Sequence, residues 1–167
     1  MKISGTGSRS FALLPQEEEA RILDDLVNEM RNIKAVYKDI IVVSGGAEGW
    51  DYELTIAAQL LDIPYELILP NRSYLTYYWE KHSVLGIDNS VNAKRMYKNA
   101  YNVKYTSDKY NKNTELFYVN HVPINLVRNI QMVEESDVFC VYGPTSRGTS
   151  QCLRVIKKLN KPWKEFK

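Results

Sequence analysis

Two kinds of apolar pattern alternate along the chain. Short runs that fit strands lie at residues 2–6, 39–44, 65–69 and 137–142, and a last short strand opens at Lys161. Between them, apolar residues recur at every third or fourth position, which predicts amphipathic helices. These helical segments lie at residues 15–34, 50–62, 124–135 and 152–159. The run at 39–44 is continuous and rich in β-branched residues, which is typical of a parallel strand buried on both faces.

Strands and helices that alternate in this way predict an α/β protein with a mostly parallel sheet of about five strands and helices on both faces. A chain of 167 residues has the size of one domain and can bury a core without disulfides or a metal. We therefore expect one domain over residues 1–167.

Residues 71–120 interrupt the alternation. They hold eight of the 12 tyrosines, together with Trp79 and many Asn and Lys residues. Two short helices are predicted there, at about 74–82 and 91–101. The segment is too short and too polar to form a hydrophobic core of its own, so we expect an insertion or lid rather than a second domain. Its rings could stack a nucleobase, follow a single strand of nucleic acid, or form a subunit contact.

Charge and composition limit the classes of partner and the cellular compartment that can be expected. Lys and Arg number 22 against 20 Asp and Glu, so binding that depends on phosphate-backbone attraction alone, and hence nucleic acid, is not expected. Cys140 and Cys152 fit buried thiols, and neither His82 nor His121 lies at ligand spacing from them, so no metal or cofactor is expected. No apolar stretch has the length of a signal peptide or a membrane span, which favours a cytoplasmic protein without a membrane partner.

Three glycine-bearing loops, at residues 5–10, 45–49 and 143–150, each follow a predicted strand. Open α/β sheets bind their ligands at the carboxyl ends of the strands. Glycines let the backbone approach a phosphate, and a helix N-terminus adds free N–H groups and partial positive charge. Arg9 and Arg147 carry guanidinium groups that can each hold a phosphate through two hydrogen bonds. The chain has no Gly-Lys-Ser/Thr, so none of these loops is a Walker A loop.

These loops and two further motifs resemble those of a known family. In chain order, the motifs are Gly7-Ser8-Arg9, Ser44 to Asp51, Arg128 to Met132, Gly148-Thr149 and Lys161-Pro162. The set resembles the SLOG superfamily, the Rossmann-like group that includes the Smf/DprA proteins and the LOG phosphoribohydrolases, and within it the small YAcAr-like branch. The second loop matches the Gly-Gly-Ala-x-Gly-x-Asp of that branch at every fixed position. The match covers residues 1–70 and 121–163 and leaves out 71–120.

The resemblance implies a Rossmann-like fold that holds a nucleotide or a nucleotide-derived molecule at the carboxyl edge of the sheet. On the matched positions it implies the ligand-binding residues Gly7, Ser8, Arg9, Gly45, Gly46, Glu48, Gly49, Asp51, Arg128, Gly148, Thr149 and Ser150. Arg128 and the turn at 148–150 would meet phosphate. Asp51 would lie near the sugar or fix its own loop, since a carboxylate at this position can also cap the helix.

One departure from the family bears on catalysis. LOG hydrolases carry Pro-Gly-Gly-x-Gly-Thr-x-x-Glu, whose Glu supports cleavage of the N-glycosidic bond. Counted from Gly148-Thr149, Cys152 stands at the position of that Glu. If this chain were a hydrolase, a different carboxylate would have to serve, and Asp51 and Glu48 are the candidates.

The favoured function is therefore binding without turnover. The ligand would be a nucleotide or a nucleotide-derived signal molecule, such as an ADP-ribose-like molecule or a cyclic nucleotide, held for sensing or sequestration. One alternative is an N-glycosidase, phosphoribohydrolase or deoxyribosyltransferase that acts on a nucleoside monophosphate. Another is single-stranded DNA binding as in Smf/DprA. The aromatic segment at 71–120 also makes a homo-oligomer an expectation.

Overall fold

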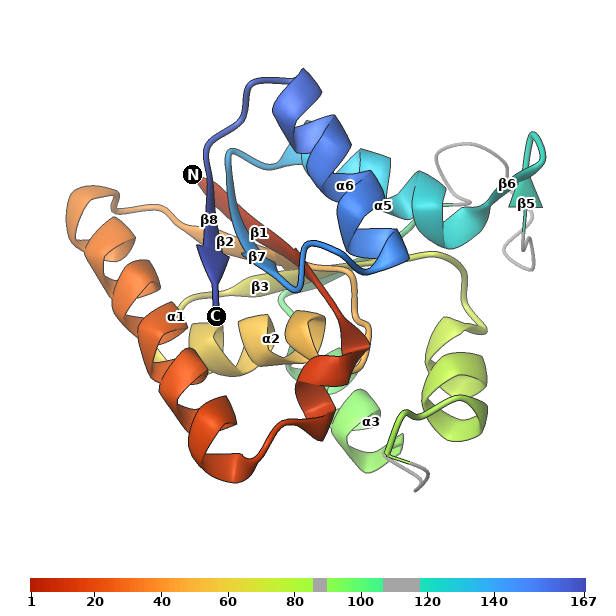
Figure 1. Cartoon of the computed structure of the whole chain (residues 1–167), viewed down its shortest axis with the longest axis horizontal. Helices are drawn as coiled ribbons and strands as arrows, with labels where there is room; N and C mark the ends of the chain where they lie inside the picture. The colour runs from red at the N-terminus through yellow and green to blue at the C-terminus, as the bar shows by residue number, and fades with distance from the viewer. Residues whose placement is uncertain (86–89, 107–117) are drawn as a thin grey trace.

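The computed structural model describes residues 1–85, 90–106 and 118–167, and residues 86–89 and 107–117 of the predicted insertion lie outside the described residues. Among the described residues, six parallel strands form one sheet in the order β4-β3-β2-β1-β7-β8 (Figure 1). The strands are β1 (Lys2–Gly7), β2 (Ile41–Ser44), β3 (Tyr65–Leu69), β4 (Asn102–Tyr105), β7 (Val138–Tyr142) and β8 (Trp163–Phe166). A separate antiparallel pair is formed by β5 (Tyr118–Val119) and β6 (Val122–Pro123).

Helices cover both faces of the sheet (Figure 1). The helical elements are η1 (Arg9–Leu13), α1 (Gln16–Val36), α2 (Trp50–Leu60), η2 (Leu75–Glu80, π-helical), α3 (Ser90–Asn99), α5 (Ile124–Glu135) and α6 (Arg147–Lys158). Apolar residues of α1, α2 and α3 share one core cluster with the sheet, and those of α5 and α6 pack on the other side of it. The predicted α/β class, with a mostly parallel sheet and helices on both faces, is confirmed, with six strands instead of about five.

The order of the strands fixes where a ligand can bind. From β1 the chain builds outward through β2, β3 and β4, and it then returns to the other side of β1 to form β7 and β8. The loops that follow β1 and β7 therefore leave the sheet in opposite directions. In open α/β sheets this reversal opens a crevice outside the carboxyl ends of the two strands.

The aromatic segment is more closely joined to the sheet than the sequence suggested. Asn102–Tyr105 pairs in parallel with β3 and adds a sixth strand, with α3 as the connection that leads into it. Tyr74 and Trp79 are buried in the main core, and the indole Nε1 of Trp79 donates to the carbonyl of Gly46 at 2.9 Å. The sequence signal for β4 was weak because an edge strand can be short and polar.

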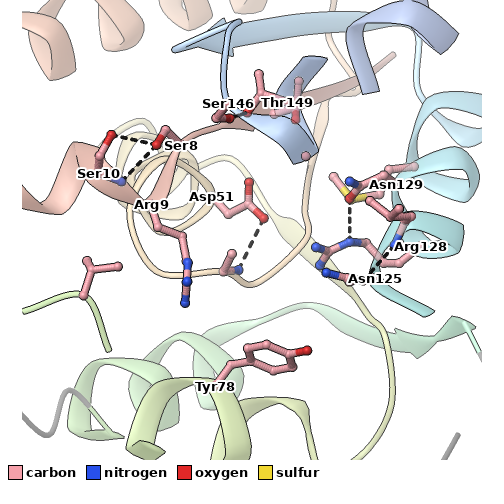
Figure 2. A pocket seen from close by; sticks show the side chains of 18 of the residues that line it. Ser8, Arg9, Ser10, Asp51, Tyr78, Asn125, Arg128, Asn129, Ser146 and Thr149 are labelled. Atoms are coloured by element: carbon pink, nitrogen blue, oxygen red, sulfur yellow. Dashed lines mark hydrogen bonds between the residues drawn. The ribbon is translucent and has the colours of Figure 1, made fainter. Parts of the chain in front are cut away.

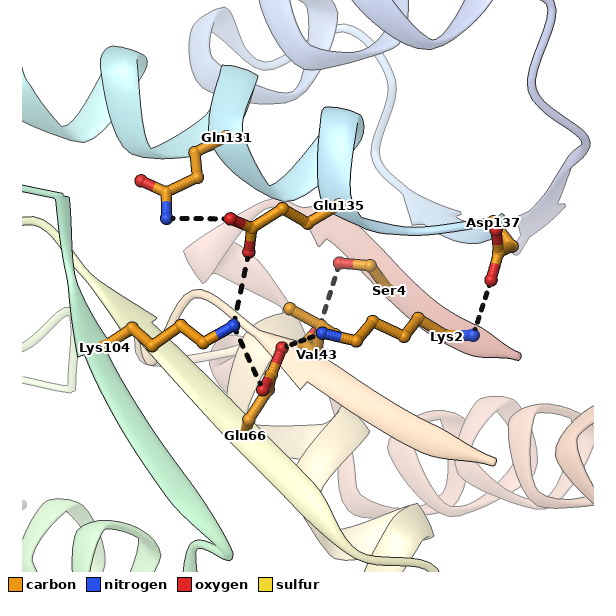
Figure 3. Close-up of polar contacts among 8 residues, drawn as sticks. All are labelled: Lys2, Ser4, Val43, Glu66, Lys104, Gln131, Glu135 and Asp137. Atoms are coloured by element: carbon orange, nitrogen blue, oxygen red, sulfur yellow. Dashed lines mark hydrogen bonds and ion pairs between the residues drawn. The ribbon is translucent and has the colours of Figure 1, made fainter. Parts of the chain in front are cut away.

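A buried carboxylate joins β3 to strands and a helix around it (Figure 3). Glu66 is only 3% exposed and pairs with Lys2 of β1 at 2.7 Å and with Lys104 of β4 at 3.5 Å. Lys104 also lies 3.7 Å from Glu135 of α5. Because a buried charge is costly unless it is paired, these contacts favour the observed strand order over alternatives that would leave Glu66 alone.

The two cysteines are both buried and free, and they lie on opposite sides of the sheet. Cys140 belongs to the cluster formed with α1 and α2, and Cys152 packs with residues of α5 and β7. Among the helices of the described residues, none is long and apolar enough to cross a lipid bilayer.

The end of β1 lies directly against the first residue of α2. A Cβ atom added to Gly7 would lie 2.4 Å from Cβ and Cγ of Trp50, which is itself fully buried. Only glycine therefore fits at position 7 without displacing the indole or the loop. Gly148, in the first turn of α6, has no atom within 4 Å of the same added position.

We expect Gly7→Ala to lower the free energy of unfolding by about 1–3 kcal/mol, the usual cost of overpacking a filled site. Gly148→Ala, the matched control, should be neutral or stabilise by up to about 1 kcal/mol, because alanine favours a helix over glycine. Urea denaturation measures both changes through the midpoint. Equal stability of the two variants would contradict the close packing of β1 on α2.

Candidate functional site

A cavity of about 420 Å³ opens at the crevice between the carboxyl ends of β1 and β7. All three glycine-bearing loops border it, together with α5 and the segment that contains η2 (Figure 2). Seven of the residues expected from the sequence line it: Gly7, Ser8, Arg9, Asp51, Arg128, Gly148 and Thr149. The reversal of strand order thus brings together residues that lie up to 142 positions apart, from Gly7 to Thr149.

The first loop presents hydroxyl groups and one exposed guanidinium. Ser8 caps η1: its Oγ accepts a hydrogen bond from the Ser10 amide at 3.1 Å and lies 2.6 Å from the Ser10 hydroxyl. Arg9 is exposed at the rim, and its Nη1 donates to the carbonyl of His82 at 3.1 Å. The cap holds this loop in a turn with its hydroxyls at the cavity wall.

The third loop supplies the N-terminus of a 12-residue helix. Ser146 precedes α6, and its hydroxyl lies at 2.7 Å from the hydroxyl of Thr149. Both residues line the cavity, and the open space above Gly148 leaves the first turn of α6 accessible. The first N–H groups of a helix have no partner within it, so this end can donate hydrogen bonds to an anion.

Arg128 forms the charged floor of the cavity. It is 5% exposed, and its guanidinium donates to the Gly45 carbonyl through Nη1 and to Asn129 Oδ1 through Nε at 2.9 Å. The guanidinium carbon also lies 5.6 Å from the centre of the Tyr74 ring. These contacts fix the direction of the side chain, so its charge is already in place before a ligand arrives.

Asp51 faces the same space from the second loop. Its carboxylate is 7% exposed and accepts a hydrogen bond from the Ala47 amide at 3.3 Å. Burial raises the pKa of Asp51, although the nearby Arg128 and the Ala47 amide act in the opposite direction. A carboxyl group that holds its proton more tightly than usual can donate or accept a hydrogen bond, and can serve as an acid or a base.

Gly45 explains how Arg128 and Asp51 approach one loop together. A Cβ atom at this position would lie 2.5 Å from Arg128 Nη1 and 2.5 Å from an oxygen of Asp51. Gly46 and Gly49 lie in the same loop, behind the cavity wall, where Gly46 accepts the bond from Trp79 and Gly49 packs on the backbone of Arg9. These three glycines shape the loop but do not line the cavity.

Glu48 and Ser150 are placed away from this cavity. The Glu48 carboxylate is buried and accepts hydrogen bonds from the Ser83 hydroxyl at 2.5 Å and the Val84 amide at 2.7 Å. The Ser150 hydroxyl donates to the carbonyl of Arg147 at 3.0 Å. Of the two carboxylates proposed as catalytic candidates, the structure brings only Asp51 into the cavity. Glu48 instead ties the second loop to the segment that follows η2.

Several lining residues were not among the site residues expected from the sequence. Tyr74, Tyr78 and Val84 come from the aromatic segment, whose rings were considered for stacking a nucleobase, but the spacing did not show which of its residues would reach the cavity. Asn125, Asn129 and Met132 of α5 also line it. Together with Arg128 they follow the i, i+3, i+4, i+7 spacing of a single helix face, so this largely polar face of the helix could have been found. In the described part of the chain, no group of three or more His, Cys, Asp or Glu residues is arranged to hold a metal ion.

The parallel sheet, its reversal of strand order and the cavity at that point define a Rossmann-like domain with a ligand cavity at its switch point. No protein-family model matches the chain, and no curated protein sequence matches it. Among solved structures, DNA processing protein A from Helicobacter pylori is similar, with a TM-score of 0.63 and 19% identity over 99% of this chain and 64% of that one.

A second solved structure, the protein TM1055, has a TM-score of 0.51 and 13% identity over 97% of this chain and 71% of its own. At these identities the similarities show a shared fold. This chain spans less than two thirds of the Helicobacter pylori protein, which binds single-stranded DNA. The assignment to the YAcAr-like branch stays a prediction.

A second buried carboxylate in α2 bears on stability. Glu53 is 7% exposed, and burial, together with the charge of Glu19, raises its pKa to about 7. In the unfolded chain this group releases its proton near the ordinary value of 4.5. The folded state therefore holds the proton more tightly, and the stability that this adds is present below pH 4.5 and is lost as the pH rises toward 7.

We expect Glu53→Gln to remove this loss, because a neutral amide does not titrate. The free energy of unfolding of Glu53→Gln relative to the wild type should rise between pH 5 and pH 8, as measured by urea denaturation at each pH. Glu17→Gln, the same substitution at an exposed position in the first turn of α1, is the control. If the difference in the free energy of unfolding between Glu53→Gln and the wild type stays constant with pH, this would contradict a buried carboxyl with a raised pKa.

Proposed function

We propose that this chain binds a nucleotide or a nucleotide-derived signal molecule, of the ADP-ribose or cyclic nucleotide kind, by its phosphate at the carboxyl edge of the sheet. The observation that carries the proposal is the convergence of two guanidinium groups, Arg9 and Arg128, on a cavity that also receives hydroxyls and a helix N-terminus. Its volume of about 420 Å³ lies in the range usual for small-molecule sites.

Each part of the cavity suits one part of such a ligand. The phosphate would lie between the first loop and the start of α6, where Ser8, Ser146 and Thr149 add hydroxyl donors. Arg128 would neutralise its charge from the floor. Asp51, which lines the cavity close to Arg128, would face the sugar of the ligand.

Single-stranded DNA binding is a second candidate, and the similarity to the Helicobacter pylori protein favours it. The small net charge of +2 disfavours nucleic acid. Against this, the same fold serves single-stranded DNA binding in a protein whose similarity extends over 99% of this chain. A nucleic acid strand would use the same phosphate contacts, since its backbone offers the same group as a free nucleotide.

Calorimetric titration with adenosine 5′-monophosphate and ADP-ribose tests the first proposal. Arg9→Ala and Arg128→Ala should each weaken binding by about tenfold or more, because hydrogen bonds to charged groups contribute about 1.5–3 kcal/mol. Arg154→Ala, an exposed arginine further along α6, is the matched control and should bind as the wild type does. Unchanged affinity in both cavity variants, with the fold intact by circular dichroism, would remove these arginines from the site.

The same protein titrated with oligothymidylate separates nucleotide binding from strand binding. Strand binding that uses several phosphates loses affinity steeply with salt, with a slope near −0.7 per phosphate contact for single strands. A mononucleotide with one phosphate would show a slope of about one contact or less. Tight oligonucleotide binding with a steep slope, and none to mononucleotides, would favour the second candidate.

Turnover is tested through the carboxylate that lines the cavity. A binder releases no free base from a nucleoside monophosphate, and we expect none from this chain, since Cys152 replaces the glutamate of LOG hydrolases. If base is released, Asp51→Asn should slow it by orders of magnitude, because an amide cannot stabilise positive charge that develops on the sugar. Glu48→Gln serves as the control, since its carboxylate lies outside the cavity. Base release that vanishes in Asp51→Asn would make the chain an N-glycosidase.

A further inference from the structure

The wall of the cavity formed by the aromatic segment differs in chemistry from the walls formed by the three loops. The loops present hydroxyl, amide and guanidinium groups, whereas the segment around η2 presents Tyr74, Tyr78 and Val84. A phosphate group is bound by charged groups and hydrogen-bond donors, and this largely apolar wall offers few of them. The ligand must therefore have an apolar or aromatic part if this side of the cavity contributes to its binding.

The two tyrosines of this wall are not equivalent. Tyr74 is 5% exposed and lies under the guanidinium of Arg128, so its ring is already covered. Tyr78 is half-buried, and its ring centre lies 4.7 Å from that of Tyr74 and 6.0 Å from that of His82. These rings fix the tilt of Tyr78. Figure 2 shows its ring directed into the cavity, across from Asp51 and on the side of Arg128.

We infer that Tyr78 is the platform for the nucleobase of the ligand, an inference that rests on the proposed function and names the part of the ligand that the phosphate loops do not recognise. Every base has a π-face, and a base stacked on an aromatic ring contributes about 1–3 kcal/mol when judged by removal of the ring. Tyr78 thus makes the site prefer nucleotides to simple sugar phosphates.

The position of the ring relative to the charges supports this division. Arg9 reaches from the first loop to the carbonyl of His82, one helical turn beyond Tyr78, so the phosphate loop and the aromatic wall meet at the rim. A ligand whose phosphate lies at the loops then has its other end directed toward the ring. The mononucleotide is the smallest molecule that offers both a phosphate and a planar base.

The test compares two ligands and three variants by calorimetry. Adenosine 5′-monophosphate carries the base, and ribose 5-phosphate has the same phosphate and sugar without it. Tyr78→Leu should weaken binding of adenosine 5′-monophosphate by roughly 5- to 150-fold and leave that of ribose 5-phosphate within about twofold. Tyr78→Phe keeps the ring and should keep the wild-type affinity for both. Tyr97→Leu, the same change at an exposed tyrosine of α3, is the matched control.

The outcomes separate this inference from the proposed function. Wild-type protein that binds both ligands equally, or Tyr78→Leu that weakens both equally, overturns the base platform while phosphate binding stands. Wild-type protein that binds neither of these ligands nor ADP-ribose overturns both proposals. If Tyr78→Leu does not fold, nuclear Overhauser contacts between the adenine protons and a tyrosine ring of the wild type test the inference instead. These contacts should persist in Tyr97→Leu and should move to the phenylalanine ring signals in Tyr78→Phe. Their absence from the wild type overturns the inference.

Discussion

The whole ligand-binding edge depends on the packing of the buried indole of Trp50. Its Nε1 donates to the carbonyl of Cys140 in β7 at 3.0 Å, and its ring stacks on Tyr142 with centres 5.4 Å apart. The ring of Phe11, from η1, packs on the same indole in a T-shaped arrangement with ring centres 5.2 Å apart, and Gly7 lies directly against it. One side chain at the start of α2 therefore contacts the ends of β1 and β7 and the helix between β1 and α1. The first and third loops leave the sheet from these strand ends, and the second loop ends at Trp50 itself, so the indole holds the bases of all three loops in a fixed relation.

That anchor also explains how a cavity with buried charges is tolerated. Asp51 follows Trp50 directly, so the fixed start of α2 sets the position of its carboxylate. Gly45 leaves room for Arg128 beside it, and the Gly45 carbonyl and Asn129 accept hydrogen bonds from the guanidinium. Burying a charge costs free energy unless it is paired and hydrogen-bonded, and the loop geometry meets most of that requirement before any ligand is bound. The cost of organising the site is thus part of folding, which leaves more of the interaction energy for binding.

Much of this arrangement could be predicted from the chain because it is local. The strand at 65–69 and the helix at 124–135 were predicted with the bounds that the structure shows, since their apolar spacing is regular. The loop residues that line the cavity followed from their place after strands. Glu48 could not be placed, because the groups that bind its carboxylate, Ser83 and Val84, come from a segment 35 residues away. The same limit applies to Tyr78. The aromatic segment suggested base stacking, but which ring reaches the cavity depends on packing between elements, which periodicity does not encode.

The two thiols give the molecule a built-in pair of kinetic probes. Burial raises the pKa of Cys140 to about 12 and that of Cys152 to about 11, so in the folded state both carry their protons and neither reacts as a thiolate at neutral pH. A disulfide reagent can modify them only when the surrounding layer opens. Cys140 of β7 shares its core cluster with α1 and α2, whereas Cys152 of α6 packs between that helix, α5 and the sheet, so their separate rates of modification measure the opening of each helical layer by itself. The sheet thus separates two reporters of local unfolding, one on each face, in a chain that has no other cysteine.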